Sequence, residues 1–197
     1  NILHSFYIYM LKTFILLTHL ILSSSAYMLT PPPTMKKMLI IGCGKLGKDV
    51  ASHFRYKGVH VSATTTNSTK IDELHKYADK VLLMSDKAAV KKTVNEVDNI
   101  FISVAPKSLS QVYPNVYIDT VGLLINYLAY ITKPIHITFI SSASAYGTIT
   151  NGDQVDENYP RPREYNHKAI ELMLAENILM QFQQKHKDLI KLCIFRP

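Results

Sequence analysis

The chain has 197 residues, a length that predicts one domain or slightly more, with a sizeable hydrophobic core. Two cysteines are too few for a disulfide framework and favour a reducing compartment, so we expect a cytoplasmic protein. The net charge of +7 is spread over many short segments, which indicates a solvated basic surface and argues against a nucleic-acid-binding protein.

Residues 1–34 differ in composition from the rest of the chain. Residues 6–22 are almost continuously apolar, although the run is short for a membrane span, and Ser24-Ser25-Ala26 has the form of a signal-peptide cleavage site. The chain begins with Asn1, and Met35 stands just before the first predicted strand. Three interpretations stay open: a signal peptide, a membrane anchor through residues 6–22, and translated upstream sequence with a natural start at Met35. The folded domain is expected to span residues 35–197.

A glycine-rich sequence follows the first strand-like run, and a helix-like segment follows it in turn. The sequence reads Gly42-Cys43-Gly44-Lys45-Leu46-Gly47. In such an arrangement the first glycine permits a tight turn, the second lets the backbone approach a phosphate, and the third lets the helix pack closely on the strand. The unpaired N–H groups of the first helical turn then face the anion. The motif predicts that these six residues bind the pyrophosphate of a dinucleotide.

Strand-like and helix-like segments alternate from residue 35 onward. Strands are predicted at 38–41, 59–64, 80–84, 99–104, 136–141 and 189–195. Helices are predicted at 46–56, 68–77, 88–95, 113–131 and 168–184. This alternation predicts an α/β fold, a doubly wound parallel sheet of the Rossmann type with helices on both faces. Its ligand crevice is expected at the carboxyl ends of the strands.

Five short motifs in this order resemble the extended or atypical short-chain dehydrogenases/reductases, and most closely the NAD-dependent epimerase/dehydratase group. They are the glycine motif at 42–47, Ser-Ser-Ala-Ser-Ala-Tyr-Gly at 141–147, Pro-Arg-Glu-Tyr at 162–165, Ala-Glu-Asn-Ile-Leu at 175–179 and Phe-Arg-Pro at 195–197. The resemblance covers essentially all of residues 35–197.

This resemblance implies an NAD(P)-dependent oxidoreductase or sugar-nucleotide epimerase. Such a protein exchanges a hydride between a nicotinamide ring and a carbinol or keto carbon of a small molecule, for example a nucleotide sugar. Family members often dimerise through helices like those predicted at 113–131 and 168–184. They also continue into a C-terminal substrate lobe, so the resemblance implies that this chain is truncated and that its own turnover is impaired.

The resemblance implies a catalytic tyrosine and lysine, but the family's Tyr-x-x-x-Lys motif is not intact here. Tyr165 matches the tyrosine by its position after Pro162, yet the next lysine, Lys168, follows after three residues instead of four. Counting back from the 175–179 motif puts Lys168 in the tyrosine position and Leu172 in the lysine position. Tyr165 and Lys168 could still converge on one helical face, and the alternatives are a surface loop tyrosine and a solvated helix lysine.

Ser142 corresponds to the family's serine that hydrogen-bonds the substrate oxygen. Ser141 and Ser144 are interpreted either as part of the same site or as turn residues that satisfy the local backbone. By family likeness, Asp86 lies near the adenine or caps the following helix, and Ala105 runs along the nicotinamide ribose.

The end of the second predicted strand bears on the choice between NAD and NADP. It carries Thr65 and Asn67 but no carboxylate that would bind a ribose 2′-hydroxyl and repel a 2′-phosphate. With Lys70 beyond, these residues favour NADP over NAD. The alternative is a turn in which Ser68 or Thr69 caps the next helix.

No cluster of histidine, cysteine and carboxylate residues has the spacing of metal ligands, so no metal is predicted, and His136 and His167 are interpreted as isolated side chains. The displaced tyrosine and lysine keep a second function open. In that alternative the protein is a non-catalytic NAD(P)-binding sensor or scaffold of the atypical short-chain dehydrogenase type.

Overall fold

A computed structural model describes residues 36–106, 116–146, 156 and 167–197 of the chain. The segment Met35–Arg196 forms one compact unit. Within the described residues, no helix combines the length and the apolar character needed to cross a membrane. The apolar run at 6–22 lies outside the described residues.

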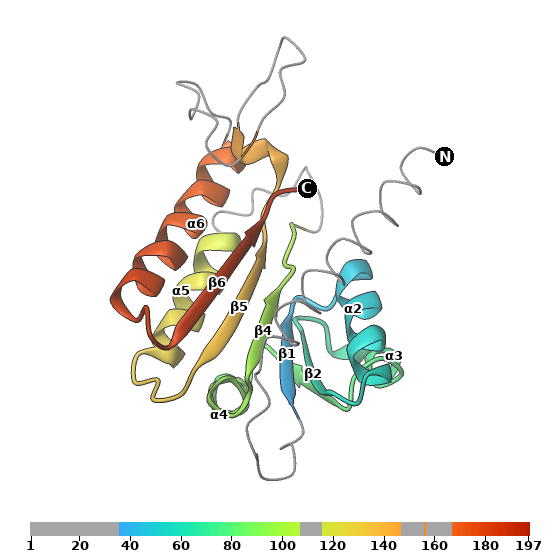
Figure 1. The fold of residues 1–197 in the computed structure, drawn as a ribbon. Helices are drawn as coiled ribbons and strands as arrows, with labels where there is room; N and C mark the ends of the chain where they lie inside the picture. Colours follow the sequence, from blue (N-terminus) through green and yellow to red (C-terminus); the bar gives the residue numbers. More distant parts are fainter. Residues whose placement is uncertain (1–35, 107–115, 147–155, 157–166) are drawn as a thin grey trace. The chain divides into compact units, whose positions relative to one another are not determined.

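Six parallel strands form a single sheet in the order β3-β2-β1-β4-β5-β6 (Figure 1). They are β1 (Lys37–Ile41), β2 (His60–Thr65), β3 (Lys80–Leu83), β4 (Asn99–Ile102), β5 (Ile135–Ile140) and β6 (Ile190–Phe195). Successive strands are added outward from β1 as far as β3, and then the chain returns to β4 on the other side of β1. The carboxyl ends of β1 and β4 therefore border the topological switch point, where doubly wound folds bind their ligands.

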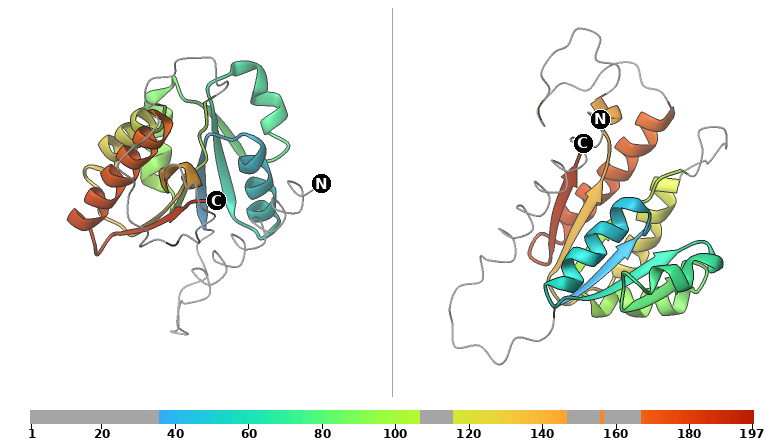
Figure 2. Two further views of the ribbon diagram at one scale, coloured as in Figure 1. Left: turned by 90° about the horizontal axis from the view of Figure 1, so that it is seen from above. Right: turned by 90° about the vertical axis from the view of Figure 1, so that its right-hand side faces the viewer.

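Helices cover both faces of the sheet (Figure 2). One face carries α2 (Lys45–Tyr56) and α3 (Ile71–Leu74), and the other carries α4 (Lys87–Glu96), α5 (Val116–Leu128) and α6 (His167–Lys185). On that second face α4 packs on α5, and α5 packs on α6. The parallel sheet and its two helical layers confirm the predicted doubly wound fold.

The central strands are buried on both faces, which explains why their sequences are apolar without alternation. Leu39 of β1 belongs to the large core cluster shared with α4, α5 and α6. Ile40 points to the opposite face, where its Cγ2 atom lies close to Gly47 of α2. On α2, Val50 and Phe54 are buried one helical turn apart and attach the helix to the sheet.

Most predicted boundaries lie within one residue of the observed ones, and three elements differ by more. The strand expected at 99–104 ends at Ile102, and the hydroxyl of Ser103, the next residue, bonds to the loop after β1. The helix expected at 68–77 is a 3₁₀ turn (η1, Ser68–Lys70) followed by the single-turn α3, because Asp79 already pairs with β2 through its N–H. The helix expected at 113–131 is observed as α5 up to Leu128, and residues 113–115 lie outside the described residues.

Candidate functional site

The glycine loop leaves the carboxyl end of β1 in a conformation that excludes a side chain at its first position. Gly42 has φ +83°, in the left-handed region that favours glycine. A Cβ atom on Gly42 would lie 2.8 Å from Cγ1 of Val104 and 2.9 Å from the backbone of the same residue. The tight turn between β1 and α2 therefore requires glycine for reasons internal to the protein.

The other two glycines of the loop differ from each other. A Cβ atom on Gly47 would lie 3.1 Å from the Gly42 carbonyl oxygen and 3.3 Å from the Ser103 hydroxyl, so this glycine permits close packing of α2 on the strand ends. Gly44 is exposed, and a Cβ atom there would meet nothing within 4 Å. The space in front of Gly44 is open to an incoming ligand.

Hydrogen bonds to both neighbouring strands orient the loop. The Gly42 N–H donates to Thr64 Oγ1 at 3.2 Å, and the Cys43 N–H donates to the Thr64 carbonyl at 3.2 Å. The Gly42 carbonyl accepts from the Gly44 N–H at 2.8 Å and from Ser103 Oγ at 2.9 Å. The loop is thereby fixed between the end of β2 and the end of β4.

The first turn of α2 offers backbone donors to an anion. Gly44 is the N-cap, no side chain caps the helix, and the first turn contains no acidic residue. The Lys48 N–H is the first to bond within the helix, to the Gly44 carbonyl at 3.0 Å. The amides of Leu46 and Gly47 precede it and have no helical carbonyl to bond. These donors, together with the positive end of the helix dipole, fit a pyrophosphate.

Two titratable side chains border this turn. Burial raises the pKa of the Cys43 thiol to about 11, so the thiol is neutral at physiological pH and adds no negative charge beside an anion. Lys48 forms an ion pair with Glu73 of α3 and lies over the ring of Tyr77, 5.4 Å from its centroid. The hydrogen bond between them raises the pKa of Lys48 and lowers the pKa of Glu73.

The end of β2 forms a compact turn without a carboxylate. The Asn67 N–H donates to Thr65 Oγ1 at 3.1 Å, and Asn67 Oδ1 accepts from the Thr69 N–H at 3.0 Å and from the Thr69 hydroxyl at 2.9 Å. Asn67 is therefore the cap, and the expectation that Ser68 or Thr69 caps this helix is wrong. The Asn67 carboxamide accepts two bonds at once, whereas the Thr69 hydroxyl is used as a donor to it.

Two further predicted contacts lie at the same edge of the sheet. The Asp86 carboxylate accepts from the Ala89 N–H at 3.0 Å and caps α4, which is the local role that the sequence left as an alternative. Ala105 is exposed and follows Val104, the residue that packs against Gly42. Both residues come after strands that end at the crevice.

The serine-rich segment after β5 divides into two environments. Ser142 Oγ accepts from the Ser144 N–H at 3.2 Å and lies 3.1 Å from Ser144 Oγ, within the short 3₁₀ turn η2 (Ala143–Tyr146) and the residue before it. Ser141 Oγ instead donates to Glu176 Oε1 of α6 at 2.5 Å. The interpretation of Ser141 as a local turn residue is wrong because its hydroxyl has this buried, distant partner.

Glu176 is the centre of a buried polar network that sequence analysis missed. Its carboxylate is fully buried and accepts from Arg196 Nε at 2.9 Å and from Arg196 Nη2 at 2.7 Å. The Arg196 guanidinium also lies over the Tyr146 ring, 4.9 Å from its centroid. The network joins the ends of β5 and β6 to α6 and η2. Its sequence signal is an acid between apolar residues of α6, at a position where a buried side chain needs a charged partner.

The structure describes only part of the proposed catalytic group. Tyr165 lies outside the described residues. Lys168 belongs to the first turn of α6, and its side chain also lies outside the described part. Leu172, the residue that the alternative count puts in the lysine position, is fully buried in the core. The roles of Tyr165, Lys168 and Ser142 stay predictions.

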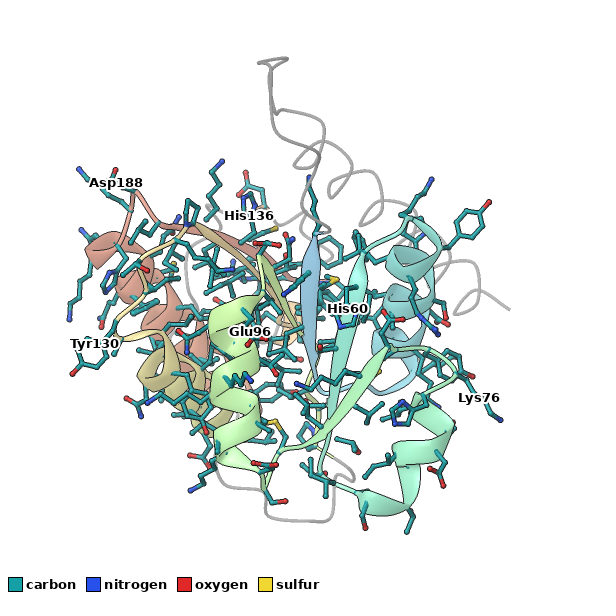
Figure 3. The ribbon with its side chains drawn as sticks, turned by 90° about the horizontal axis from the view of Figure 1, so that it is seen from below. His60, Lys76, Glu96, Tyr130, His136 and Asp188 are labelled. Atoms are coloured by element: carbon teal, nitrogen blue, oxygen red, sulfur yellow. The ribbon has the colours of Figure 1, made fainter. Side chains whose placement is uncertain are left out.

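The histidines of the sheet lie away from the crevice. Figure 3 views the edge where the strands begin, and His60 and His136 are both labelled on it. Burial, followed by the nearby charges of Lys191 and Lys36, lowers the pKa of His136. Among the residues that the structure describes, no three His, Cys, Asp or Glu side chains form a group that could hold a metal ion.

Comparison with known proteins relates this geometry to a fold family. A family model described as shikimate/quinate 5-dehydrogenase matches residues 25–111. No curated protein matches the sequence.

Solved structures match over most of the chain. A UDP-glucose 4-epimerase from Thermotoga maritima, solved with UDP-glucose, is 20% identical with a TM-score of 0.66, and the match covers 81% of this chain and 54% of that one. A UDP-glucuronic acid 4-epimerase from Bacillus cereus, in complex with NAD, is 16% identical with a TM-score of 0.64, covering 81% and 55%. A short-chain dehydrogenase/reductase superfamily protein from Agrobacterium tumefaciens, with bound NAD, is 18% identical with a TM-score of 0.64, covering 81% and 48%.

The chain thus has the Rossmann-type fold found in NAD-dependent epimerases and proteins of the short-chain dehydrogenase/reductase superfamily, as the five motifs indicated. It spans about half the length of these solved structures.

Proposed function

We propose that this chain contains the NAD(P)-binding domain of an oxidoreductase or of a protein like the sugar-nucleotide epimerases and dehydratases. The observation that carries the proposal is the glycine loop at the switch point, where Gly44 leaves space directly before the Leu46 and Gly47 amides of the first helical turn. The bound NAD in the Bacillus and Agrobacterium proteins, which share the fold, supports it. The bound cofactor would supply or accept the hydride that is exchanged with a carbinol or keto carbon.

The residues of the loop, 42–47, would hold the diphosphate through their backbone. Thr65 and Asn67 would border the adenine ribose, Asp86 the adenine, and Ala105 the nicotinamide ribose. The end of β2 carries Thr65 in place of an acidic residue, and the exposed Lys70 follows. These residues favour NADP over NAD, because a 2′-phosphate would meet a positive charge and no negative one.

Catalysis in this proposal depends on three residues. Ser142 would bind the substrate oxygen. The Ser144 N–H donates to Ser142 Oγ and so orients the Ser142 hydroxyl. Tyr165 would move the proton, and Lys168 would favour the ionised tyrosine. The substrate class is a small molecule such as a nucleotide sugar, the type of ligand bound by the Thermotoga protein.

We also propose a homodimer, because α6 exposes two large apolar side chains.

The first test changes Gly44 to aspartate. Gly44 has an ordinary φ of −81° and open space at its Cβ position, so Gly44→Asp is expected to fold, and an aspartate at an N-cap stabilises a helix. The new carboxylate would occupy the first-turn amides and repel a diphosphate. We expect an unchanged or higher Tm together with complete loss of NADPH and NADH binding, measured by nucleotide fluorescence.

Gly44→Ala is the matched control for this change. It adds a Cβ atom without charge and is expected to keep the Tm and to weaken binding only partly. If Gly44→Asp bound NADPH as tightly as the unmodified chain, the assignment of the glycine loop to the diphosphate would be wrong.

The rival function, a non-catalytic NAD(P)-binding sensor or scaffold, rests on the three-residue step from Tyr165 to Lys168 and on the burial of Leu172. Turnover of a panel of sugar nucleotides by the natural protein separates the two functions. If Tyr165 moves the proton, Tyr165→Phe is expected to lower kcat at least a hundredfold. Tyr130→Phe, at an exposed position labelled in Figure 3 in the view of the edge where the strands begin, is expected to change nothing. Turnover that is insensitive to Tyr165→Phe would eliminate this role, and a protein that binds NADPH but turns over no substrate would favour the sensor.

A further inference from the structure

Two residues outside the glycine motif hold the peptide bond between Gly42 and Cys43 from opposite sides. On one side, the Gly42 carbonyl accepts from the Ser103 hydroxyl at 2.9 Å. On the other side, the Cys43 N–H donates to the Thr64 carbonyl at 3.2 Å. The Thr64 hydroxyl holds the preceding peptide group, because Thr64 Oγ1 accepts from the Gly42 N–H at 3.2 Å. A peptide group is planar, with its C=O and N–H pointing in opposite directions, so bonds at both ends fix its rotation.

We propose that Thr64 and Ser103 are positioning residues, whose hydroxyls hold the glycine loop in its anion-binding conformation before any ligand arrives. They act through the backbone of the loop, which leads directly into the first turn of α2. This inference rests on the proposed binding of NAD(P). It goes beyond that proposal because it assigns affinity to two side chains that belong to no motif, one in β2 and one directly after β4.

Burial and packing argue that these hydroxyls serve the loop and not the sheet. Thr64 is fully buried at the end of a strand, where a buried hydroxyl needs a hydrogen-bond partner, and the loop supplies it. The Ser103 N–H donates to the Ile41 carbonyl at 2.9 Å and so continues the pairing of β4 with β1 without help from its side chain. The Ser103 hydroxyl is therefore available for the Gly42 carbonyl, which it binds.

The loop needs such support because two of its first three residues are glycines. Glycine populates backbone conformations on both sides of φ 0°, so an unsupported loop would visit several of them. Only the fraction of chains with the correct conformation binds ligand, and the apparent dissociation constant rises in proportion as that fraction falls. A loop that is already held avoids this loss.

The test uses the 197-residue chain with Thr64→Val and Ser103→Ala, and measures three quantities: the Kd for NADPH and NADH, amide hydrogen exchange at residues 42–47 without ligand, and Tm. Loss of either hydroxyl is expected to raise Kd about fivefold, the factor that corresponds to one ordinary hydrogen bond, and to speed exchange in the loop. Thr64→Ser keeps the hydroxyl and is expected to restore both values.

Thr93→Val is the matched control. Thr93 is also buried, and its hydroxyl accepts from Lys80 Nζ at 3.1 Å, far from the loop in the fold. It is expected to lower Tm as Thr64→Val does, but to leave Kd and loop exchange unchanged.

Variants that lose stability and keep the original Kd would overturn the positioning role and leave a purely structural one. If the unmodified chain bound neither nucleotide, the proposed function itself would fail. Hydrogen exchange in the ligand-free chain would still test the positioning role. Faster exchange at residues 42–47 in the two variants would support this role, and unchanged exchange in both would contradict it.

Discussion

Cys43 places a thiol between two glycines of the loop, where burial keeps it protonated. Only 8% of the residue is exposed, and its pKa is raised to about 11 chiefly because a thiolate would lose its hydration there. Nearby Lys48 works in the opposite direction but with less effect. The residue is therefore a small apolar spacer at physiological pH and not a nucleophile.

Its titration gives a prediction with a definite sign. Because the thiolate is the reactive form, the rate at which a thiol reagent modifies Cys43 is expected to rise about tenfold per pH unit from pH 8 to 10 and to level off only near 11. Cys193→Ser removes the second thiol so that one site is measured. Saturating NADPH is expected to slow the reaction. A plateau of the rate near pH 8.5 would contradict the raised pKa.

At this scale the glycines could be predicted from sequence and their supporting residues could not. Gly42, Gly44 and Gly47 stand in a fixed spacing that follows from the turn they make. Thr64 and Ser103 approach the loop only through the pairing of β1 with β2 and β4, which no local pattern encodes. The same limit explains why Glu176 and Arg196, twenty residues apart, were not paired in advance.

Among the elements, one ion pair links the region just after β6 to the buried side of α6. Glu176 is fully buried, and the Arg196 side chain is 19% exposed. Removing one partner of a buried pair leaves the other without compensation, whereas an exposed pair contributes little. The ends of β5 and β6, and with them Ser142, are therefore expected to depend on this carboxylate.

Glu176→Gln tests this dependence. It is expected to lower the free energy of unfolding by about 2 to 3 kcal/mol, near the low end for buried pairs because Arg196 retains some contact with water. Glu73→Gln is the matched control, since it breaks the pair with Lys48 at a side chain that is 44% exposed, and it is expected to change the unfolding midpoint in urea very little. Equal effects of the two substitutions would refute the structural importance of the buried network.

The strands could be predicted better than the helices between them. Continuous apolar runs identify β1 and β4, because both faces of these strands are covered. In β5 apolar residues alternate with His136 and Thr138, which is the period of a strand. The segment after β2 was harder, since its polar residues are compatible with a helix. Its length is set instead by Asp79, which returns to the sheet and bonds to β2 through its backbone and its carboxylate.

For the whole molecule, the sequence was sufficient to predict the fold class but not the oligomeric state. Alternating strands and helices permit few arrangements, and right-handed crossovers select the doubly wound one. Assembly depends on outward-facing side chains, and their exposure is known only once α5 and α6 are packed. On α6, Ile170 and Leu174 are 44% and 45% exposed and lie one turn apart.

These two side chains lead to a prediction about the oligomeric state. If α6 packs against a second copy, the chain is expected to elute as a dimer, and the double substitution Ile170→Ser with Leu174→Ser is expected to shift it to a monomer with little loss of Tm. Tyr130→Ser, at a position that is 91% exposed, is the control and is expected to leave the mass unchanged. Light scattering gives the molar mass of the unmodified chain and of both variants. If all three were monomers, the proposed dimer would be contradicted.

The contrast between positions 42 and 44 provides a marker for evolutionary loss of the ligand. Steric contact with Val104 retains glycine at 42 in any chain that still folds this way, whereas no neighbour in the described part of the chain demands glycine at 44. A descendant that had abandoned its nucleotide would be free to acquire a side chain at 44 while preserving 42. The residue found at this one position in related genes therefore distinguishes lineages that still use a cofactor from those that keep only the architecture.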